Sequence, residues 1–308
     1  MVGVEFIGRL GNQMFTYAFA RVIMEQRGEK TFTANFKRCS PMQETGDDGL
    51  SHFNVLPYST VDYDIILRKG SLLQQAAYLI YMLFSRMPVI GQRDRFMLYL
   101  ERWLRKMDIH ITGAAAPAYS VKSKEKCTFV RGYFQDKQFF DDIRPILLLE
   151  FTPKLPPQEC NKALYEAAAR PGSVCVHVRR GDFLSDTYRK NFYVCTPEYF
   201  KKAISIMCQR VKEPCFIFFS DDIEWVRKHL FVNGHPCFYE SGDDPAWEVM
   251  RLMSSCNHFV ISNSTFAWWA SYLCEREDKI IIIPEHWYAN PEWHSNLTNG
   301  DEYTRLML

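Results

Sequence analysis

The chain has 308 residues, and its 37 Lys and Arg residues against 36 Asp and Glu residues give a formal net charge of +1. This balance argues against a nucleic-acid-binding protein that works by general neutralisation of phosphates. Hydrophobic residues make up 47% of the sequence and charged residues 24%, which excludes disorder, collagen and coiled coil as its main state. A chain of this length is expected to form two domains of about 150 residues each.

The N-terminal half begins with an α/β pattern and then becomes irregular. Residues 2–7 predict a buried strand, and residues 12–27 predict a helix that ends at Gly28. Residues 46–59 are rich in turn-forming residues and indicate no clear element.

A basic helical stretch follows over residues 66–106. Its only acidic residues are Asp94 and Glu101, against eight basic ones: Arg68, Lys69, Arg86, Arg93, Arg95, Arg102, Arg105 and Lys106. Such an imbalance is typical of a solvated helix face, the commoner case, or of peripheral contact with an anionic membrane surface. Only residues 72–84 approach a membrane segment, and they fall short of the roughly 20 residues that span a bilayer.

The C-terminal half alternates clearly between strands and helices. Short apolar runs predict strands at residues 173–178, 215–220, 236–239, 258–262 and 279–283. The stretches between them predict helices at residues 197–210, 222–230, 245–255 and 266–275. This order predicts a parallel sheet covered on both faces, which binds ligands at the carboxyl ends of its strands. The proline-rich residues 153–157 are the best linker candidate, so we expect domains at residues 1–152 and 153–308.

The cysteines and the N-terminus indicate the compartment. The ten cysteines are scattered, without a C-x-x-C pair or zinc-like spacing, which indicates reduced thiols, no metal site and a reducing compartment. The N-terminus has neither the basic region nor the apolar length of a signal peptide, so we expect a cytoplasmic protein.

The first candidate site is the turn GRLGNQ at residues 8–13, between the first strand and its helix. Backbone N–H groups and the helix dipole at such a turn can receive a phosphate or a sugar hydroxyl. The turn lacks the complete G-x-G-x-x-G pattern, and two glycines there commonly serve packing alone. Several hydrogen-bond donors lie close together in it, which makes candidates of Gly11, Asn12 and Gln13.

The second candidate site is the motif HVRRGD at residues 177–182, at the end of a predicted strand. An Arg at a strand end can bind two oxygens of a phosphate, and it keeps its charge at every relevant pH. The structural alternative is a salt-bridged loop in which Asp182 pairs with Arg180. A His, two Arg and an Asp at one strand end exceed what a fold needs, which favours function for His177, Arg179 and Asp182.

Two further strand ends carry polar residues. Asp221 and Asp222 follow the strand at residues 215–220, where a carboxylate could bind a guanine base or simply cap the next helix. The sequence SNSTF at residues 262–266 begins at the last residue of the strand predicted at residues 258–262. Its hydroxyls and amide suit both a helix cap and a phosphate cradle without a metal. The candidates there are Ser262, Asn263, Ser264, Thr265 and Phe266.

Other signals point to structure. Trp268 and Trp269 are expected to pack in the core. Asp62-Tyr63-Asp64 has a D-x-D form found at some metal sites, but it follows no convincing strand, so we interpret it as surface charge. No P-loop, H-E-x-x-H or G-x-S-x-G motif occurs.

Three motifs occur in order along the chain: GRLGNQMF at residues 8–15, HVRRGDF at residues 177–183 and SNSTFAWW at residues 262–269. Together they resemble the signature of glycosyltransferase family 11, the α-1,2-fucosyltransferases. The resemblance implies a GT-B-type α/β architecture, in which two Rossmann-like domains face each other across a cleft. Thr16 stands where Gln is commoner in that family, which is a mild departure.

The resemblance also implies an activity. It is the inverting, metal-independent transfer of L-fucose from GDP-fucose to the 2-hydroxyl of a terminal galactoside in a surface glycan. The resemblance implies no metal ion and no cofactor, since GDP-fucose is consumed as a substrate. Residues 153–308 would bind GDP-fucose, and residues 1–152 would lie on the side of the galactose-terminated acceptor. If that acceptor is lipid-linked, the basic helical stretch would contact the inner face of the bacterial membrane.

Residue roles follow from the same resemblance. The donor diphosphate is assigned to Arg179 and to residues 262–265, with Phe266 beside them. Guanine is assigned to Asp221 or Asp222. Asn12 and Gln13, with Gly11 between strand and helix, are placed in the cleft near the fucose.

The base that would deprotonate the acceptor hydroxyl is left open. Asp182 is the first candidate and His177 the second, although a histidine there also suits a buried structural role. A sufficiently dissociative transition state would need no strong base, and Asp182 would then orient Arg179 or Arg180. Two other functions remain: another GDP-sugar transferase of different linkage, and a non-catalytic nucleotide-sugar or glycan-binding protein.

Overall fold

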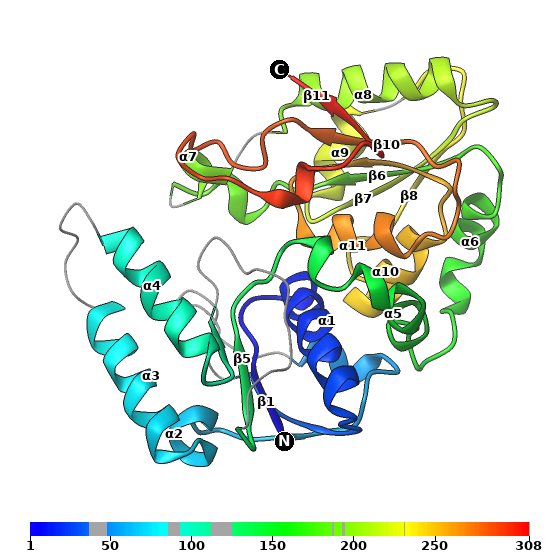
Figure 1. Ribbon diagram of the computed structural model, residues 1–308. Helices are drawn as coiled ribbons and strands as arrows, with labels where there is room; N and C mark the ends of the chain where they lie inside the picture. The colour runs from blue at the N-terminus through cyan, green and yellow to red at the C-terminus, as the bar shows by residue number, and fades with distance from the viewer. Residues whose placement is uncertain are drawn as a thin grey trace. The chain divides into compact units, whose positions relative to one another are not determined.

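The computed structural model describes residues 1–36, 48–85, 93–111, 125–186, 188–192, 195–230 and 232–307. These residues form two α/β units, Met1–Phe151 and Thr152–Leu308 (Figure 1). Every strand pair described in them is parallel. The α/β class and the two Rossmann-like units of a GT-B-type fold are therefore confirmed, whereas the cleft between the units stays a prediction.

The first unit contains a five-stranded sheet in the order β3-β2-β1-β5-β4. Its strands are short: β1 (Val2–Glu5), β2 (Phe32–Asn35), β3 (Tyr58–Thr60), β4 (Ile109–Ile111) and β5 (Thr128–Arg131). Only β1 was predicted from the sequence, because β2 to β5 form no clear apolar run.

Helix α1 (Leu10–Arg27) follows β1 after a turn at Gly8 and ends at Gly28. Both glycines have positive φ angles, which other residues rarely adopt. The basic stretch predicted as helical over residues 66–106 contains the helices α2, α3 and α4. Residues 86–92 of that stretch lie outside the described part of the chain. The remaining helices of the unit are η1 (Gly49–His52), α2 (Ile65–Lys69), α3 (Leu72–Ser85), α4 (Arg93–Arg105), η2 (Lys137–Phe139), η3 (Asp141–Ile143) and α5 (Arg144–Glu150).

The second unit contains a six-stranded sheet in the order β11-β10-β9-β6-β7-β8. Its strands are β6 (Ser173–Val178), β7 (Cys215–Ser220), β8 (Cys237–Tyr239), β9 (His258–Ile261), β10 (Ile281–Pro284) and β11 (Tyr303–Leu306). Its helices are η4 (Glu159–Asn161), α6 (Lys162–Ala168), η5 (Asp182–Leu184), α7 (Arg189–Phe192), α8 (Pro197–Arg210), α9 (Ile223–His229), α10 (Ala246–Ser254), α11 (Thr265–Leu273) and η6 (Asn296–Thr298). Figure 1 shows α8 on one face of this sheet and α10 and α11 on the other.

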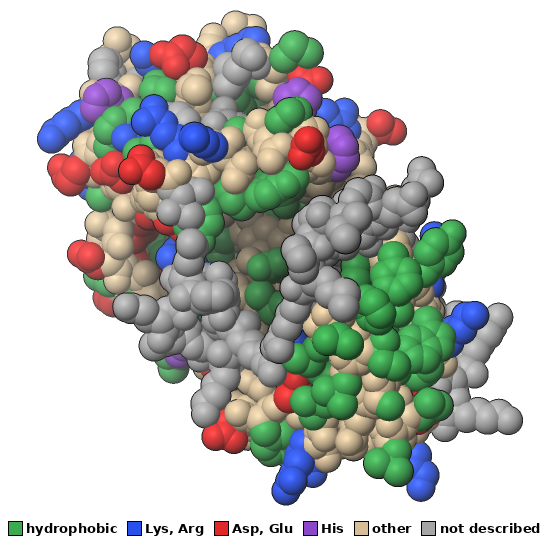
Figure 2. Space-filling model, turned by 90° about the vertical axis from the view of Figure 1, so that its left-hand side faces the viewer, with side chains coloured by type: hydrophobic (Ala, Val, Ile, Leu, Met, Phe, Trp, Pro, Cys, Tyr) green, Lys and Arg blue, Asp and Glu red, His purple; other side chains and the backbone are tan. Residues whose placement is uncertain are grey.

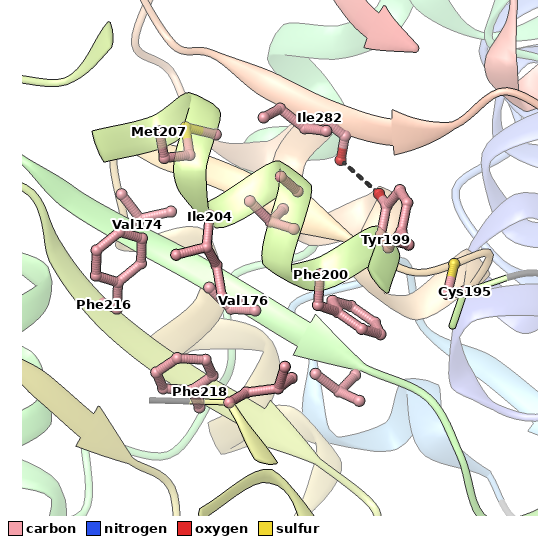
Figure 3. Packing of buried hydrophobic residues seen from close by; sticks show 14 of the residues in the cluster. Val174, Val176, Cys195, Tyr199, Phe200, Ile204, Met207, Phe216, Phe218 and Ile282 are labelled. Carbon is pink, nitrogen blue, oxygen red and sulfur yellow. Dashed lines mark hydrogen bonds between the residues drawn. The ribbon is translucent and has the colours of Figure 1, made fainter. Parts of the chain in front are cut away.

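An apolar core fills the space between this sheet and α8 (Figure 3). Every residue of β6 and β7 is buried, as expected for strands covered on both faces. The hydroxyl of Tyr199 in α8 donates to the carbonyl oxygens of Ile261 and Ile282, at 2.7 and 3.3 Å. These bonds hold β9 and β10 against the helix. The core side chains that meet here include Val174, Val176, Phe200, Ile204, Met207, Phe216 and Phe218.

The proline-rich segment after Phe151 is held by the second unit. Arg251 of α10 donates to the carbonyl oxygens of Pro153 and Leu155. Glu248, one turn earlier in the same helix, accepts a bond of 2.9 Å from the backbone N–H of Gln158. The segment is therefore the first part of the second unit.

Candidate active site at the carboxyl edge of the second sheet

Three of the predicted motifs meet at one edge of the second sheet. Strand β6 pairs with β7 on one side and with β9 on the other, in a register that places Val178 opposite Ser220 and His177 opposite Ile261. Because the strands are parallel, their carboxyl ends are adjacent. The residues at and just after these ends are those predicted from the sequence: HVRRGD, the Asp221-Asp222 pair and SNSTF.

Arg179 is held between two carboxylates. Its Nη1 atom lies 2.7 Å from Oδ2 of Asp221, and its Nη2 atom lies 2.7 Å from Oδ1 of Asp182. The hydrogen bond to Asp182 uses one of the five guanidinium N–H donors, the contact with Asp221 is an ion pair, and N–H groups remain for a ligand. The side chain is 19% exposed. The guanidinium is therefore fixed in orientation before any anion binds, as electrostatic catalysis requires.

Gly181 makes this arrangement possible. A Cβ atom at position 181 would lie 2.6 Å from Oδ2 of Asp221, closer than real Cβ contacts allow. The other oxygen of Asp221 accepts a 2.9 Å bond from the backbone N–H of Arg180. The sequence predicts a turn at Gly181, but nothing in it indicates that the carboxylate of a distant strand end occupies the space of a side chain.

The side chain of Arg180 makes contacts within the protein, with Asp222 and Trp225. Its Nε atom lies 3.1 Å from Oδ2 of Asp222, and its guanidinium carbon lies 3.6 Å from the ring centroid of Trp225. Asp222 also caps α9, since it accepts a bond from the backbone N–H of Trp225 at 3.3 Å. The loop alternative, with Asp182 on Arg180, is not what forms, because Asp182 bonds to Arg179 instead. Arg180 and Asp222 thus anchor the end of β6 to α9.

His177 connects two strand ends from inside the unit. Its Nδ1 atom lies 2.9 Å from Oγ of Ser262, and both side chains are buried. Burial lowers the pKa of His177 to about 4, so the imidazole is neutral at neutral pH. This geometry supports the structural role rather than that of a base in contact with the acceptor.

Helix α11 begins beside this contact with an open N-terminus. Ser264 occupies the N-cap position with an extended backbone, and its side chain forms no capping hydrogen bond. The N–H groups of the first turn are therefore available to an anion. Ser264, Thr265 and Phe266 are half-buried.

Asn263 supports this helix start without facing it. Its amide nitrogen donates to the carbonyl oxygens of Phe192 and Trp287, each at 2.8 Å, and the side chain is buried. Ser262 and Asn263 hold the loop through internal bonds, whereas Ser264 and Thr265 are half-buried. A role for residues 262–265 at the diphosphate stays a prediction.

The candidate site residues of the first unit, Gly11, Asn12 and Gln13, are buried or half-buried. Gly11 is buried, and the buried side chain of Gln13 donates to the carbonyl oxygen of Gly8 and accepts from the backbone N–H of Gly49, both at 3.1 Å. Asn12 is half-buried and accepts a 2.9 Å bond from Gln135. Gln13 thus fixes the turn. A role for these three residues near the transferred sugar stays a prediction.

Comparison with known proteins identifies the family. The family model described as Glycosyl transferase family 11 matches residues 1–303. The chain belongs to glycosyltransferase family 11. The match extends over both units, so the motifs of the first unit belong to the same family pattern as the site in the second.

The relatives of this family 11 chain include bacterial and animal proteins. An O-antigen biosynthesis glycosyltransferase, WbnK of Escherichia coli, is 27% identical over 92% of this chain and 93% of its own length. An alpha-1,2-colitosyltransferase of Escherichia coli is 25% identical over 99% of both chains. The mouse galactoside 2-alpha-L-fucosyltransferase Sec1 is 34% identical over 46% of this chain and 41% of its own. Among solved structures, a mutant of Arabidopsis thaliana FUT1 with GDP has a TM-score of 0.47 and 12% identity, over 93% of this chain and 71% of its own.

Position 16 shows how this family 11 chain accommodates its departure from the common motif. Thr16 is buried, and its hydroxyl donates to the carbonyl oxygen of Gly132 at 2.7 Å. The residue therefore joins α1 to the loop after β5.

Trp268 and Trp269 are buried in the core, as expected. Asp64 of the D-x-D sequence caps α2 through the backbone N–H of Leu67, so the surface-charge interpretation was incomplete.

Proposed function

We propose that this family 11 protein transfers L-fucose from GDP-fucose to the 2-hydroxyl of a terminal galactoside, with inversion and without a metal ion. The observation that carries the proposal is the position of Arg179 at the end of β6, beside the open N-terminus of α11 at the end of β9. The α-1,2 linkage and the fucosyl group are supported by relatives named for them. The galactoside acceptor is supported by the name of the mouse relative.

The chemistry requires a stabilised leaving group. Fucosyl transfer builds positive charge on the anomeric carbon while the departing GDP gains negative charge. The Arg179 guanidinium and the first N–H groups of α11 would bind the diphosphate from two sides. Because both are fixed before the reaction, their attraction increases as the charge develops, which lowers the barrier. In this way the chain itself would supply the positive charge that a metal ion supplies in other transferases.

Asp182 and Asp221 would act through Arg179. Asp182 accepts a hydrogen bond from one end of the guanidinium and Asp221 forms an ion pair with the other end, so together they hold it in place. We assign Asp182 this positioning role, which is the alternative that a dissociative transition state allows. Guanine binding by Asp221 or Asp222 is left as a prediction, because both carboxylates already bond to arginines.

Colitosyl transfer is the second candidate. An alpha-1,2-colitosyltransferase matches nearly the whole of this chain, whereas the mouse fucosyltransferase matches less than half of it. The donor site described above is compatible with either sugar, because Arg179 and α11 would contact the diphosphate and not the sugar ring.

The test is a transfer assay with the purified full-length protein. GDP-fucose or GDP-colitose is mixed with a terminal β-galactoside in EDTA, and GDP release and the linkage of the product are measured. The proposal expects acceptor-dependent GDP release from GDP-fucose and a product linked at the 2-hydroxyl. Release from GDP-colitose alone would establish the second candidate, and no release with either donor would support a binding protein.

A further inference from the structure

Helix α3 is apolar on the side that faces away from the core. Its fourteen residues, LLQQAAYLIYMLFS, include no charged side chain. Ala77 and Tyr78 are buried against the sheet. On the opposite side Leu72, Leu79 and Leu83 follow one another at helical spacing and are 85%, 52% and 60% exposed. A helix that only covered its own core would carry polar residues there.

Helix α4 extends this apolar surface. The rings of Phe84 in α3 and Phe96 in α4 lie 5.0 Å apart, which joins the two helices side by side. Phe96, Tyr99 and Trp103 are exposed at helical spacing. Figure 2 shows the hydrophobic side chains gathered in one patch. We call it the apolar hairpin face, which comprises Leu72, Leu73, Leu79, Ile80, Leu83, Phe96, Tyr99 and Trp103.

Basic residues border the apolar hairpin face. Four exposed ones lie just before α3 and at the end of α4: Arg68, Lys69, Arg102 and Lys106. Glu101, the acidic residue of the same turn, is buried. In the sequence, Arg86 follows α3, and the first turn of α4 contains Arg93 and Arg95 against Asp94 alone. The surface therefore combines exposed apolar side chains with a positive border.

We propose that the apolar hairpin face docks the protein on a lipid bilayer that contains anionic lipids. Leucine and isoleucine side chains would enter the outer edge of the acyl chains, with Tyr99 and Trp103 at the level of the headgroups. The basic border would bind the anionic headgroups. A second copy of this chain is a poorer occupant, because two positive borders would face each other.

The helix lies on the bilayer and does not cross it. Fourteen residues of α3 rise about 21 Å, less than the roughly 30 Å of the hydrocarbon core. Within the described part of the chain, no helix has the length and apolar character of a membrane span. The inference concerns the first unit alone and does not depend on which sugar is transferred.

Vesicle flotation of the full-length protein tests the docking. Vesicles of phosphatidylcholine alone are compared with vesicles that contain about 30% phosphatidylglycerol, at low and at high salt. We expect flotation with the anionic vesicles, a loss of at least about 10-fold in the Leu79→Glu/Leu83→Glu variant, and weakening with salt. Arg102→Glu/Lys106→Glu should reduce binding to the anionic vesicles in the same direction.

The matched control is Leu149→Glu, which places the same charge on a leucine of α5 that is 74% exposed in the same unit. It should float like the wild type, and all variants should keep the wild-type melting temperature and turnover with a water-soluble acceptor. Flotation unchanged in Leu79→Glu/Leu83→Glu, or unaffected by salt and by anionic lipid, would overturn the proposal. So would a dimer in solution that dissociates in that variant while wild-type protein ignores vesicles.

Discussion

The Nη1 atom of Arg179 and the Oδ2 atom of Asp221 are 2.7 Å apart, and this ion pair connects the ends of two neighbouring strands. On the other side of the guanidinium, Arg179 pairs with Asp182, which lies on the turn that follows it. A guanidinium held on two sides keeps its orientation when an anion arrives.

Arg179→Lys should lower turnover by at least about 100-fold with little change in melting temperature, because an ammonium cannot bind two carboxylates and a diphosphate in one plane. Steady-state GDP release in the transfer assay measures this. The control is Arg276→Lys, which changes an arginine of the exposed Arg276–Asp278 pair. Near-normal turnover of Arg179→Lys would reject the proposed role.

Gly181→Ala should lower turnover by about 10-fold or more, because the new methyl group would displace the carboxylate of Asp221. A double-mutant cycle isolates this cause. In an Asp221→Ala background the carboxylate is gone, so adding Gly181→Ala should cost little further activity. Additive losses in the cycle would mean that Gly181 acts through something other than Asp221.

Asp182→Asn and Asp182→Ala separate positioning from base catalysis. The asparagine keeps an oxygen that can accept the bond from Nη2 of Arg179, so it should retain most of the activity and the shape of the pH–rate profile. The alanine removes that support and should lose about 10-fold. If both variants were equally poor and the profile became flat, Asp182 would be the base.

His177 should make folding sensitive to acid. Its pKa is about 4 in the folded chain, against about 6.5 when unfolded. As pH falls from about 6.5 toward 4, the unfolded chain gains a proton that the folded chain excludes, so the free energy of unfolding decreases. His177→Gln removes this contribution and should lose less stability than the wild type between about pH 7 and 4.5.

Urea unfolding at the two pH values measures the difference. The pKa of His110 is likewise lowered, to about 3, by burial, and it is present in both proteins, so the comparison reports His177 alone. Equal pH dependence of wild type and variant would show that His177 is not the neutral buried group described here.

The second unit was predictable from the sequence because its short apolar runs alternate regularly with helix-length amphipathic stretches. The helix predicted at residues 197–210 has those bounds in the structure, and the strands predicted at residues 173–178 and 215–220 do as well. Edge strand β11 was missed, because Tyr303–Leu306 is half exposed and lacks an apolar run. In the first unit, β2, β3 and β4 contain polar residues among their apolar ones and form no apolar run.

The site was predictable as a set of strand ends, but not as a set of contacts. Parallel pairing brings Arg179, Asp221 and Ser264 to one edge, which follows from the order of elements. Which of the polar residues face inward depends on packing that the sequence does not record. Asn263 illustrates the difference, since the carbonyl groups of Phe192 in α7 and of Trp287 accept bonds from an amide that could equally have faced a ligand.

The most direct test of the central claim is whether Arg179 and the start of α11 bind the same diphosphate. Thr265→Pro removes one N–H from the first turn of α11, while proline suits that helical position and the extended backbone of Ser264 before it. Thr265→Ala, which keeps the N–H, is its control. Affinities for GDP and for guanosine are measured by titration in EDTA.

We expect the wild type to prefer GDP strongly over guanosine, and this preference to fall at least about 10-fold in both Arg179→Lys and Thr265→Pro but not in Thr265→Ala. Equal weakening of GDP and guanosine in the two variants, or an unchanged preference in either, would contradict it.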